Sequence, residues 1–281
     1  MNRRCRLASP PLVLVFAASD PSCGAGLQAD ILTLASMSCH PLTVVTALTA
    51  QDSVGVYDIA PVSAEWVVKQ AQTLLQDMTV AACKIGLLGG AEQVKSIADL
   101  LAALPKMPVI VDPVLASGRG DVMADQALIS AIREHLLPLT TVLTPNTLEA
   151  RRLVAGSAGV PEAAAPTLAE CGRQLLDLGC EYVLLTGTHH DTPQVINELY
   201  HQGHGRVRAD SWPRLPGSYH GSGCTLASAV AAGLAQGYPV EAAVHAAQRY
   251  TWETLDAAFR PGKGQFIPDR LFSHRPGNDD E

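Results

Sequence analysis

The sequence predicts an α/β fold in which helices cover both faces of a mostly parallel sheet. Short apolar runs of strand length alternate with longer stretches of helical spacing along most of the 281 residues. Residues 223–236 are almost all small or apolar, which is typical of a helix buried on every side. Polar side chains follow several of the apolar runs. Together these observations indicate a three-layer α/β/α sandwich.

The first half of the chain alternates regularly between strand and helix patterns. Residues 12–17 form an unbroken apolar run and residues 42–50 are rich in β-branched side chains, so we expect two buried strands. Ser63 is a suitable N-cap for the helix that follows. The elements expected in this half are strands at 12–17, 42–50, 83–88 and 108–112 and helices at 25–37, 63–77 and 92–104.

The second half contains one interruption of this alternation. Residues 195–212 alternate in polarity around Gly203 and Gly205, which indicates an antiparallel hairpin at the sheet edge. The polar tail after Leu271 is expected to fray. The other expected elements are strands at 141–144 and 182–186 and helices at 125–135, from Thr147, at 167–178, at 223–236 and at 240–259.

Composition limits the class of protein. With 47% hydrophobic and 17% charged residues, the chain can bury a large core, and we expect a single domain over residues 1–281 with its core at about 12–271. The net charge of −7 argues against a general binder of nucleic acid or anionic membranes. The seven scattered cysteines contain no C-x-x-C pair, so we expect neither a zinc site nor disulfides. A cytoplasmic protein is predicted.

The segment from His220 to Thr225 predicts an anion site. Gly221, Ser222 and Gly223 precede the apolar helix, whose N-terminus offers unpaired N–H groups and the positive end of the helix dipole. Glycines let an anion approach the backbone closely. Cys224 falls in the first turn, where the dipole is expected to lower the thiol pKa. The structural alternative is a glycine-rich turn that only leads the chain into a packed helix.

Further polar residues fall at the expected carboxyl ends of strands, where parallel sheets bind ligands. Asp20 and Asp30 follow the first strand and could accept hydrogen bonds from a polar substrate. Gln51 ends the second strand with an amide that both donates and accepts, as the edge of a heterocycle requires. Asn146 follows a later strand. Each could instead have a purely structural role in capping or turns.

Two carboxylates suggest a magnesium site. Asp112 ends the strand at residues 108–112, and Glu149 follows the strand at 141–144. Mg²⁺ prefers hard oxygen ligands and retains several water molecules, so two carboxylates could hold it directly or through water.

Taken in order, these motifs resemble the hydroxymethylpyrimidine/phosphomethylpyrimidine kinase family, the thiamine-pathway branch of the ribokinase-like fold. The resemblance runs from about Leu12 to Leu271. The segments that carry it are Ala18 to Asp30, Thr46 to Gln51, Lys84 to Leu88, Asp112-Pro113-Val114, Thr144-Pro145-Asn146 with Glu149, and His220 to Thr225.

This resemblance implies ATP- and Mg²⁺-dependent phosphorylation of 4-amino-5-hydroxymethyl-2-methylpyrimidine and then of its monophosphate. It also implies a homodimer. Cys224 would lie near the attacking oxygen, with the amides of residues 221–224 around the transferred phosphate. The site residues it implies are Gln51, Asp30, Ala18 and Asp20 for the pyrimidine, Asn146, Thr186 and Arg119 for ATP, and Asp112 and Glu149 for the metal.

The chain departs from the family pattern at three places. Ala18 replaces the first glycine of the opening motif. The lysine that usually follows Asp-Pro-Val is absent, and Arg119 stands one place later. Thr186 replaces a second lysine, close to His189. Arg119 and His189 are the candidate substitutes for the lost cations.

Two other functions stay open at this point. One is a kinase of the same fold that acts on pyridoxal or a related ring, for which Gln51 and the Asp-Pro-Ser opening are less suited. The other is a non-catalytic pyrimidine-binding sensor, against which Asp112, Glu149 and the anion loop argue.

Overall fold

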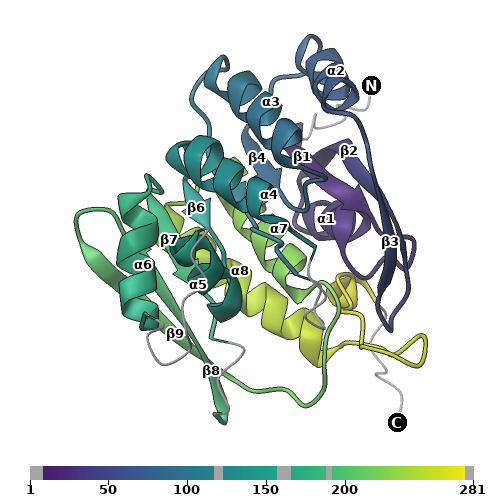
Figure 1. Cartoon of the computed structure of the whole chain (residues 1–281). Coiled ribbons are helices and arrows are strands. Elements are labelled where there is room, and N and C mark those ends of the chain that lie inside the picture. The colour runs from purple at the N-terminus through teal and green to yellow at the C-terminus, as the bar shows by residue number, and fades with distance from the viewer. Residues whose placement is uncertain (1–8, 117–122, 157–165, 188–191, 276–281) are drawn as a thin grey trace, which may run out of the picture.

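The computed structural model describes residues 9–116, 123–156, 166–187 and 192–275. Figure 1 shows their arrangement as a sheet between two layers of helices. The strands are β1 Leu12–Ser19, β2 His40–Gln51, β3 Val56–Pro61, β4 Ala82–Ile85, β5 Val109–Val111, β6 Val142–Leu143, β7 Tyr182–Leu185, β8 Gln194–His201 and β9 Gly205–Pro213. The α-helices are α1 Gly26–Ser36, α2 Ala64–Leu75, α3 Ala91–Ala102, α4 Gln126–Ala131, α5 Thr147–Ala155, α6 Leu168–Asp177, α7 Ser222–Ala235 and α8 Val240–Asp256.

All the described strands belong to one sheet, in the order β3-β2-β1-β4-β5-β6-β7-β8-β9. The central part from β2 to β7 is parallel. The strands β3, β8 and β9 pair antiparallel at the two edges. Six neighbouring parallel strands therefore end at the same edge of the sheet, which is where a ligand site is expected.

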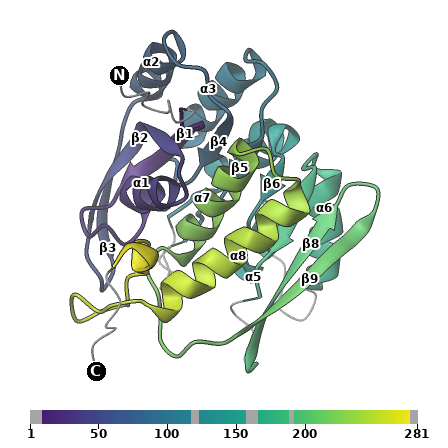
Figure 2. The ribbon, with the colours of Figure 1, turned by 180° about the vertical axis from the view of Figure 1, so that it is seen from behind.

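Helices cover both faces of this sheet. The helices α2 to α6 lie on the face toward the viewer in Figure 1, and α1, α7 and α8 lie on the face seen in Figure 2. Each face has its own apolar core, one around Phe16 and Ile97 and the other around Val15 and Val230. Residues 225–234 of α7 are all buried, as the all-apolar pattern predicted. The three-layer α/β/α prediction is confirmed.

Local sequence signals account for most of the boundaries. Ser63 caps α2 by accepting the Trp66 N–H, and the hairpin of β8 and β9 forms the antiparallel edge, both as predicted. The helix expected at 125–135 begins as α4 and continues as a π-helix, Ile132–Leu136. The strand β3 was not expected, because its alternation is weak and its residues are mostly exposed at the sheet edge.

Within the part of the chain that the structure covers, none of the helices combines the length and apolar character that crossing a membrane requires.

Candidate active site

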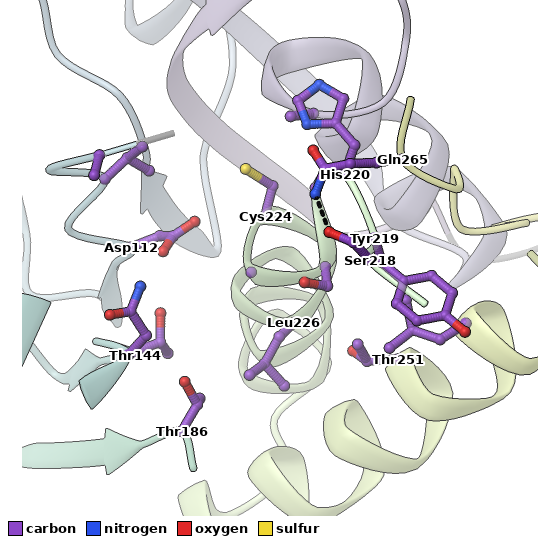
Figure 3. A pocket seen from close by; sticks show the side chains of 18 of the residues that line it. Asp112, Thr144, Thr186, Ser218, Tyr219, His220, Cys224, Leu226, Thr251 and Gln265 are labelled. Carbon is purple, nitrogen blue, oxygen red and sulfur yellow. Dashed lines mark hydrogen bonds between the residues drawn. The ribbon is translucent and has the colours of Figure 1, made fainter. Parts of the chain in front are cut away.

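A cavity of about 720 Å³ opens at the carboxyl edge of the parallel strands. Its walls come from segments far apart in the sequence, because the strands that carry them are neighbours in the sheet. Figure 3 shows Asp112, Thr144 and Thr186 on one side and the first turns of α7, with Cys224 and Leu226, facing them. The predicted site residues that line it are Ala18, Gln51, Asp112, Asn146, Glu149, Thr186, Gly221, Ser222, Gly223 and Cys224.

The N-terminus of α7 opens into this cavity. Gly221 is its N-cap and has a left-handed backbone (φ 80°). A Cβ there would lie 1.9 Å from the Gly24 carbonyl oxygen, so only glycine fits. No described residue accepts a hydrogen bond from the N–H groups of residues 222–224. These groups and the helix dipole remain available to an anion, as the sequence predicted.

Two acidic side chains line the cavity: Asp112 directly follows β5, and Glu149 lies in the first turn of α5. A Cβ built on Gly223 would be 3.7 Å from Asp112 Oδ1, so the Asp112 carboxylate lies beside the first turn of α7. Burial raises the pKa of Asp112 to about 6. The positive charge of Lys84 opposes this rise, and the negative charge of Asp30 adds to it. Burial and the Asp112 charge raise the pKa of Glu149 to about 8. The negative charge of Asp112 therefore acts on Glu149, so the two carboxylates lie close enough to influence each other's ionisation.

Cys224 occupies the predicted place but not the predicted ionisation state. Burial raises the pKa of its thiol to about 12, with Lys84 opposing and Asp112 and Asp30 reinforcing the rise. The expectation of a thiol acidified by the helix dipole is wrong, because burial and the carboxylates outweigh the dipole.

Lys84 is a cavity residue to which the sequence analysis gave no role. It is fully buried and its Nζ lies 2.8 and 2.9 Å from the two carboxylate oxygens of Asp30. Ser228 Oγ donates to the same carboxylate at 2.6 Å. Gly86 stands on the same face of the chain as Lys84, and a Cβ there would be 2.8 Å from Nζ, so glycine makes room for the lysine head.

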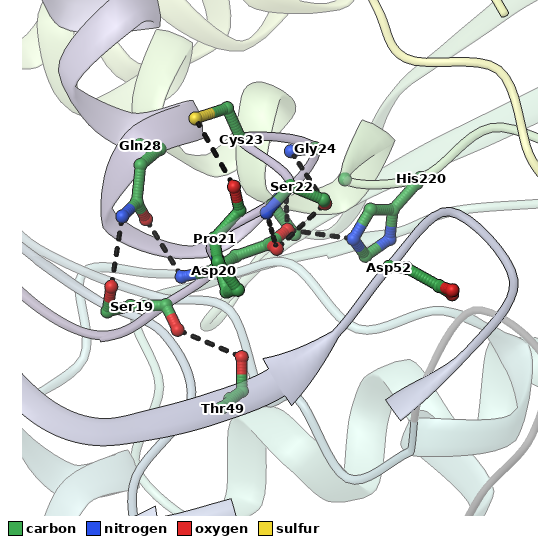
Figure 4. A network of polar contacts seen from close by, with 12 residues as sticks. Ser19, Asp20, Pro21, Ser22, Cys23, Gly24, Gln28, Thr49, Asp52 and His220 are labelled. Atoms are coloured by element: carbon green, nitrogen blue, oxygen red, sulfur yellow. Dashed lines mark hydrogen bonds and ion pairs between the residues drawn. The ribbon is translucent and has the colours of Figure 1, made fainter. Parts of the chain in front are cut away.

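Asp20 and Asp30 were expected to contact substrate, and the structure places both of them behind the cavity wall. Both are fully buried and neither lines the cavity. Asp20 accepts hydrogen bonds from Ser22, from the Ala25 N–H at 2.7 Å and from His220 Nε2 at 2.8 Å (Figure 4). Burial alone would raise the pKa of Asp20, but these hydrogen bonds lower it. Both carboxylates are therefore hydrogen-bonded within the protein and lie behind the residues that line the cavity.

The remaining predicted residues take three kinds of position. Gln51 is the last residue of β2 and Ala18 lies near the end of β1, both at the cavity wall. Asn146 caps α5 by accepting the N–H groups of Leu148 and Glu149, so its side chain is partly engaged. Thr186 pairs with Asn146 across a β-bridge. Arg119 lies outside the described residues.

Besides Lys84, the cavity contains polar residues that no motif indicated. Gln248 on α8 accepts the Asn197 amide at 2.9 Å and the Trp212 indole N–H at 3.0 Å. Gln265 donates to Ser218 at 2.7 Å at the opposite end (Figure 3). No local sequence pattern could indicate these residues, because they come from the hairpin, α8 and the C-terminal loop, which meet only in the folded chain.

Fold and cavity together are those of a small-molecule phosphotransferase. Comparison with known proteins gives the family. The family model described as phosphomethylpyrimidine kinase matches residues 20–269, and the chain belongs to that family. A hydroxymethylpyrimidine/phosphomethylpyrimidine kinase from Streptomyces coelicolor is 38% identical over 260 residues, covering 91% of this chain and 93% of that protein. A protein of the same name from Mycobacterium tuberculosis is 38% identical over 266 residues, covering 94% and 95%.

Solved structures show the same fold. The pyridoxal kinase from Staphylococcus aureus in complex with pyridoxal has a TM-score of 0.83 at 26% identity, with 95% of each chain covered. The phosphomethylpyrimidine kinase from Clostridium difficile has a TM-score of 0.72 at 28% identity, with 87% of this chain and 99% of that chain covered. The predicted family resemblance is confirmed.

Proposed function

We propose that this chain uses ATP to phosphorylate the hydroxymethyl group of 4-amino-5-hydroxymethyl-2-methylpyrimidine and then the phosphate of the monophosphate formed. The relatives at 38% identity carry both activities in their names. The Staphylococcus aureus pyridoxal kinase has been solved with AMP-PCP, which supports a nucleotide in the same kind of cavity.

One observation carries the proposal: the free N–H groups at the start of α7 and the Asp112 carboxylate lie beside each other in the cavity. Phosphoryl transfer needs alignment and neutralisation of charge on the transferred group more than covalent help from the protein. The amides of residues 222–224 would stabilise that charge. With a pKa of about 12, Cys224 stays a thiol at neutral pH, so we assign it the role of orienting the substrate hydroxyl or Asp112 rather than that of a resident thiolate.

Asp112 and Glu149 fit a magnesium ion. Both are buried and their pKa values are raised, so a bound cation would offset the cost of holding two negative charges there. Among the residues that the structure covers, no group of three or more potential ligands could enclose a metal. Two carboxylates with substrate phosphates and water are the usual protein share for Mg²⁺. When bound there, Mg²⁺ would supply positive charge beside the ATP phosphates.

The raised pKa of Glu149 also predicts how the stability of the metal-free protein depends on pH. The pKa of Glu149 rises from its ordinary value near 4.5 to about 8, so folding of the metal-free protein becomes less favourable as pH rises between these values. Replacing Glu149 with Gln removes this penalty and should stabilise the metal-free protein at pH 8 by on the order of 3 kcal/mol, with little effect at pH 4.

Thermal unfolding at pH 4, 6 and 8 with and without Mg²⁺ measures this effect. Mg²⁺ should raise the melting temperature of the wild type more at pH 8 than at pH 6, and the Glu149→Gln variant should lose most of this response. Glu92→Gln, on the exposed first turn of α3, is the matched control. Equal pH profiles for wild type and Glu149→Gln would contradict the assignment.

Gln51 should determine affinity for the pyrimidine. Replacing it with Ala removes an amide at the cavity wall, and we expect KM for the pyrimidine to rise about thirtyfold with kcat changed less than threefold. The assay follows ADP release on the alcohol and on its monophosphate. Wild-type protein that binds the pyrimidine without releasing ADP would be a sensor and would refute the proposed activity.

Pyridoxal is the second candidate substrate, because the pyridoxal kinase structures give TM-scores up to 0.83 against 0.72 for the phosphomethylpyrimidine kinase. Direct competition decides between them. With both rings at equal concentration, the proposed function requires a larger kcat/KM for the pyrimidine.

The proposal further includes a single catalytic domain and a cytoplasmic location, as composition and cysteine usage predict, and a homodimer, as the family resemblance implies. Light scattering on the purified full chain measures the last of these.

A further inference from the structure

Arg270 is the largest fully buried side chain in the described structure. It follows α8, in a segment that the bridge between Tyr219 and Phe266 joins to the loop before α7. A buried guanidinium is costly unless its donors are used, so the partners of Arg270 indicate what the residue holds in place.

The partners of Arg270 are backbone and hydroxyl oxygens of the two loops that meet beside the cavity. Its Nη2 donates to the Gly24 carbonyl at 2.6 Å, and Nη1 donates to the Cys23 carbonyl at 3.3 Å. Its Nε donates to Thr225 Oγ1 at 3.0 Å, and Nη2 also reaches the Gly221 carbonyl at 3.4 Å. One planar group thus joins the loop after β1 to the first turn of α7.

The Gly221 carbonyl is held by three donors. Besides Arg270, it accepts the Thr225 N–H at 3.0 Å and the Thr225 hydroxyl at 2.8 Å. A trans peptide points its N–H away from its carbonyl. A fixed Gly221 carbonyl therefore fixes the Ser222 N–H in the opposite direction, out of the helix N-terminus and into the cavity.

The charge of Arg270 acts in the same direction. In the described structure the hydrogen bonds of its guanidinium go to neutral oxygens, so its positive charge stays beside the first turn of α7, and the carboxylates of Asp20 and Asp30 act on it from farther away. Its Nη2 donates to the carbonyls of both Gly24 and Gly221, at 2.6 and 3.4 Å, so this one nitrogen ties the loop after β1 to the residue that caps α7.

We propose that Arg270 is a positioning residue for phosphoryl transfer, which holds the first turn of α7 so that its free N–H groups stay aimed at the transferred phosphate. This inference deepens the proposed function and rests on it. Because Arg270 does not line the cavity, its loss should impair turnover and leave substrate affinity nearly unchanged.

The test compares Arg270→Lys and Arg270→Ala with Arg275→Ala. Arg275 lies in the same segment, pairs with Asp269 at 2.7 Å and contacts neither loop, so its variant should keep wild-type kcat. Per folded molecule, as measured by near-UV circular dichroism, Arg270→Ala should lose about a hundredfold in kcat with KM values for ATP and pyrimidine within threefold. Arg270→Lys should recover part of the lost kcat, because the lysine ammonium keeps the positive charge but lacks the planar set of N–H donors of a guanidinium.

A second variant covers the case in which Arg270→Ala does not fold. Thr225→Val keeps the side-chain volume and removes the hydroxyl that links Arg270 Nε to the Gly221 carbonyl, so kcat should fall about tenfold with KM unchanged. Variants of Arg270 and Thr225 with wild-type kcat per folded molecule, or with raised KM and unchanged kcat, would overturn the inference. Failure of the wild type to phosphorylate the pyrimidine would instead overturn the proposed function.

Discussion

With asparagine in place of Asp112, the chain is expected to bind its pyrimidine normally and to turn it over about a thousandfold more slowly. The substitution keeps the shape of the side chain and removes its negative charge. That charge faces the first turn of α7, where the phosphoryl group is proposed to be transferred.

The same substitution should not weaken the metal-free fold. The Asp112 charge contributes to the raised pKa of Glu149, so its removal relieves repulsion between two buried carboxylates. The melting temperature without Mg²⁺ at pH 8 should therefore equal or exceed that of the wild type, whereas the stabilisation by Mg²⁺ should disappear. If the Asp112→Asn variant lost its folded state together with its activity, this expectation would be wrong.

Asp125→Asn is the matched control for this experiment. Asp125 caps α4 by accepting the Leu128 N–H at 2.8 Å, and asparagine is an equally good N-cap. Its steady-state kinetics and melting temperature should match those of the wild type. If Asp112→Asn retained kcat within tenfold, Asp112 would not belong to the reacting group of residues.

Local sequence patterns were sufficient for most of this fold. Apolar strands and capped helices are specified by residues close to one another, so α2 with its Ser63 cap and the hairpin of β8 and β9 could be predicted. The strand β3 could not, because an exposed edge strand needs no apolar face and gains its hydrogen bonds from β2. The motif residues at strand ends could be placed together because parallel strands share one edge.

The roles within the site were harder to predict than its location. Asp30 was expected at the substrate, but its partner Lys84 is 54 positions away, and no local pattern indicates the pairing. The thiol of Cys224 was expected to be acidic from its place at a helix N-terminus, whereas burial near Asp112 decides its pKa. The hydrogen-bond partners through which Arg270 acts are 45 or more positions away. Each of these effects depends on side chains that only the tertiary fold brings together.

Lys84→Met is expected to have the largest effect on stability. The pair with Asp30 is fully buried, and removing one partner leaves a charge in the interior. Such a change costs about 3–5 kcal/mol, which corresponds to a fall in melting temperature of roughly 10 °C for a chain of this size. Asp30 would keep only the Ser228 hydroxyl among its side-chain partners in the described structure.

The matched control is Lys95→Met on the exposed face of α3, which should leave the melting temperature within about 2 °C of the wild type. The double variant Lys84→Met, Asp30→Asn separates stability from chemistry. It removes the orphaned charge and should regain at least half of the lost stability.

Activity should not return with stability in this double variant. Lys84 lines the cavity, and its charge opposes the rise in the pKa values of both Asp112 and Cys224. Loss of the Lys84 charge raises the pKa of Asp112, and loss of the Asp30 charge offsets only part of this rise because the effect of Lys84 is the larger one. The rise of kcat with pH should therefore move to higher pH as well as fall in height. A double variant with wild-type kcat and pH profile would assign Lys84 to folding alone, and Asp112 would then owe its ionisation to the bound substrates rather than to the protein.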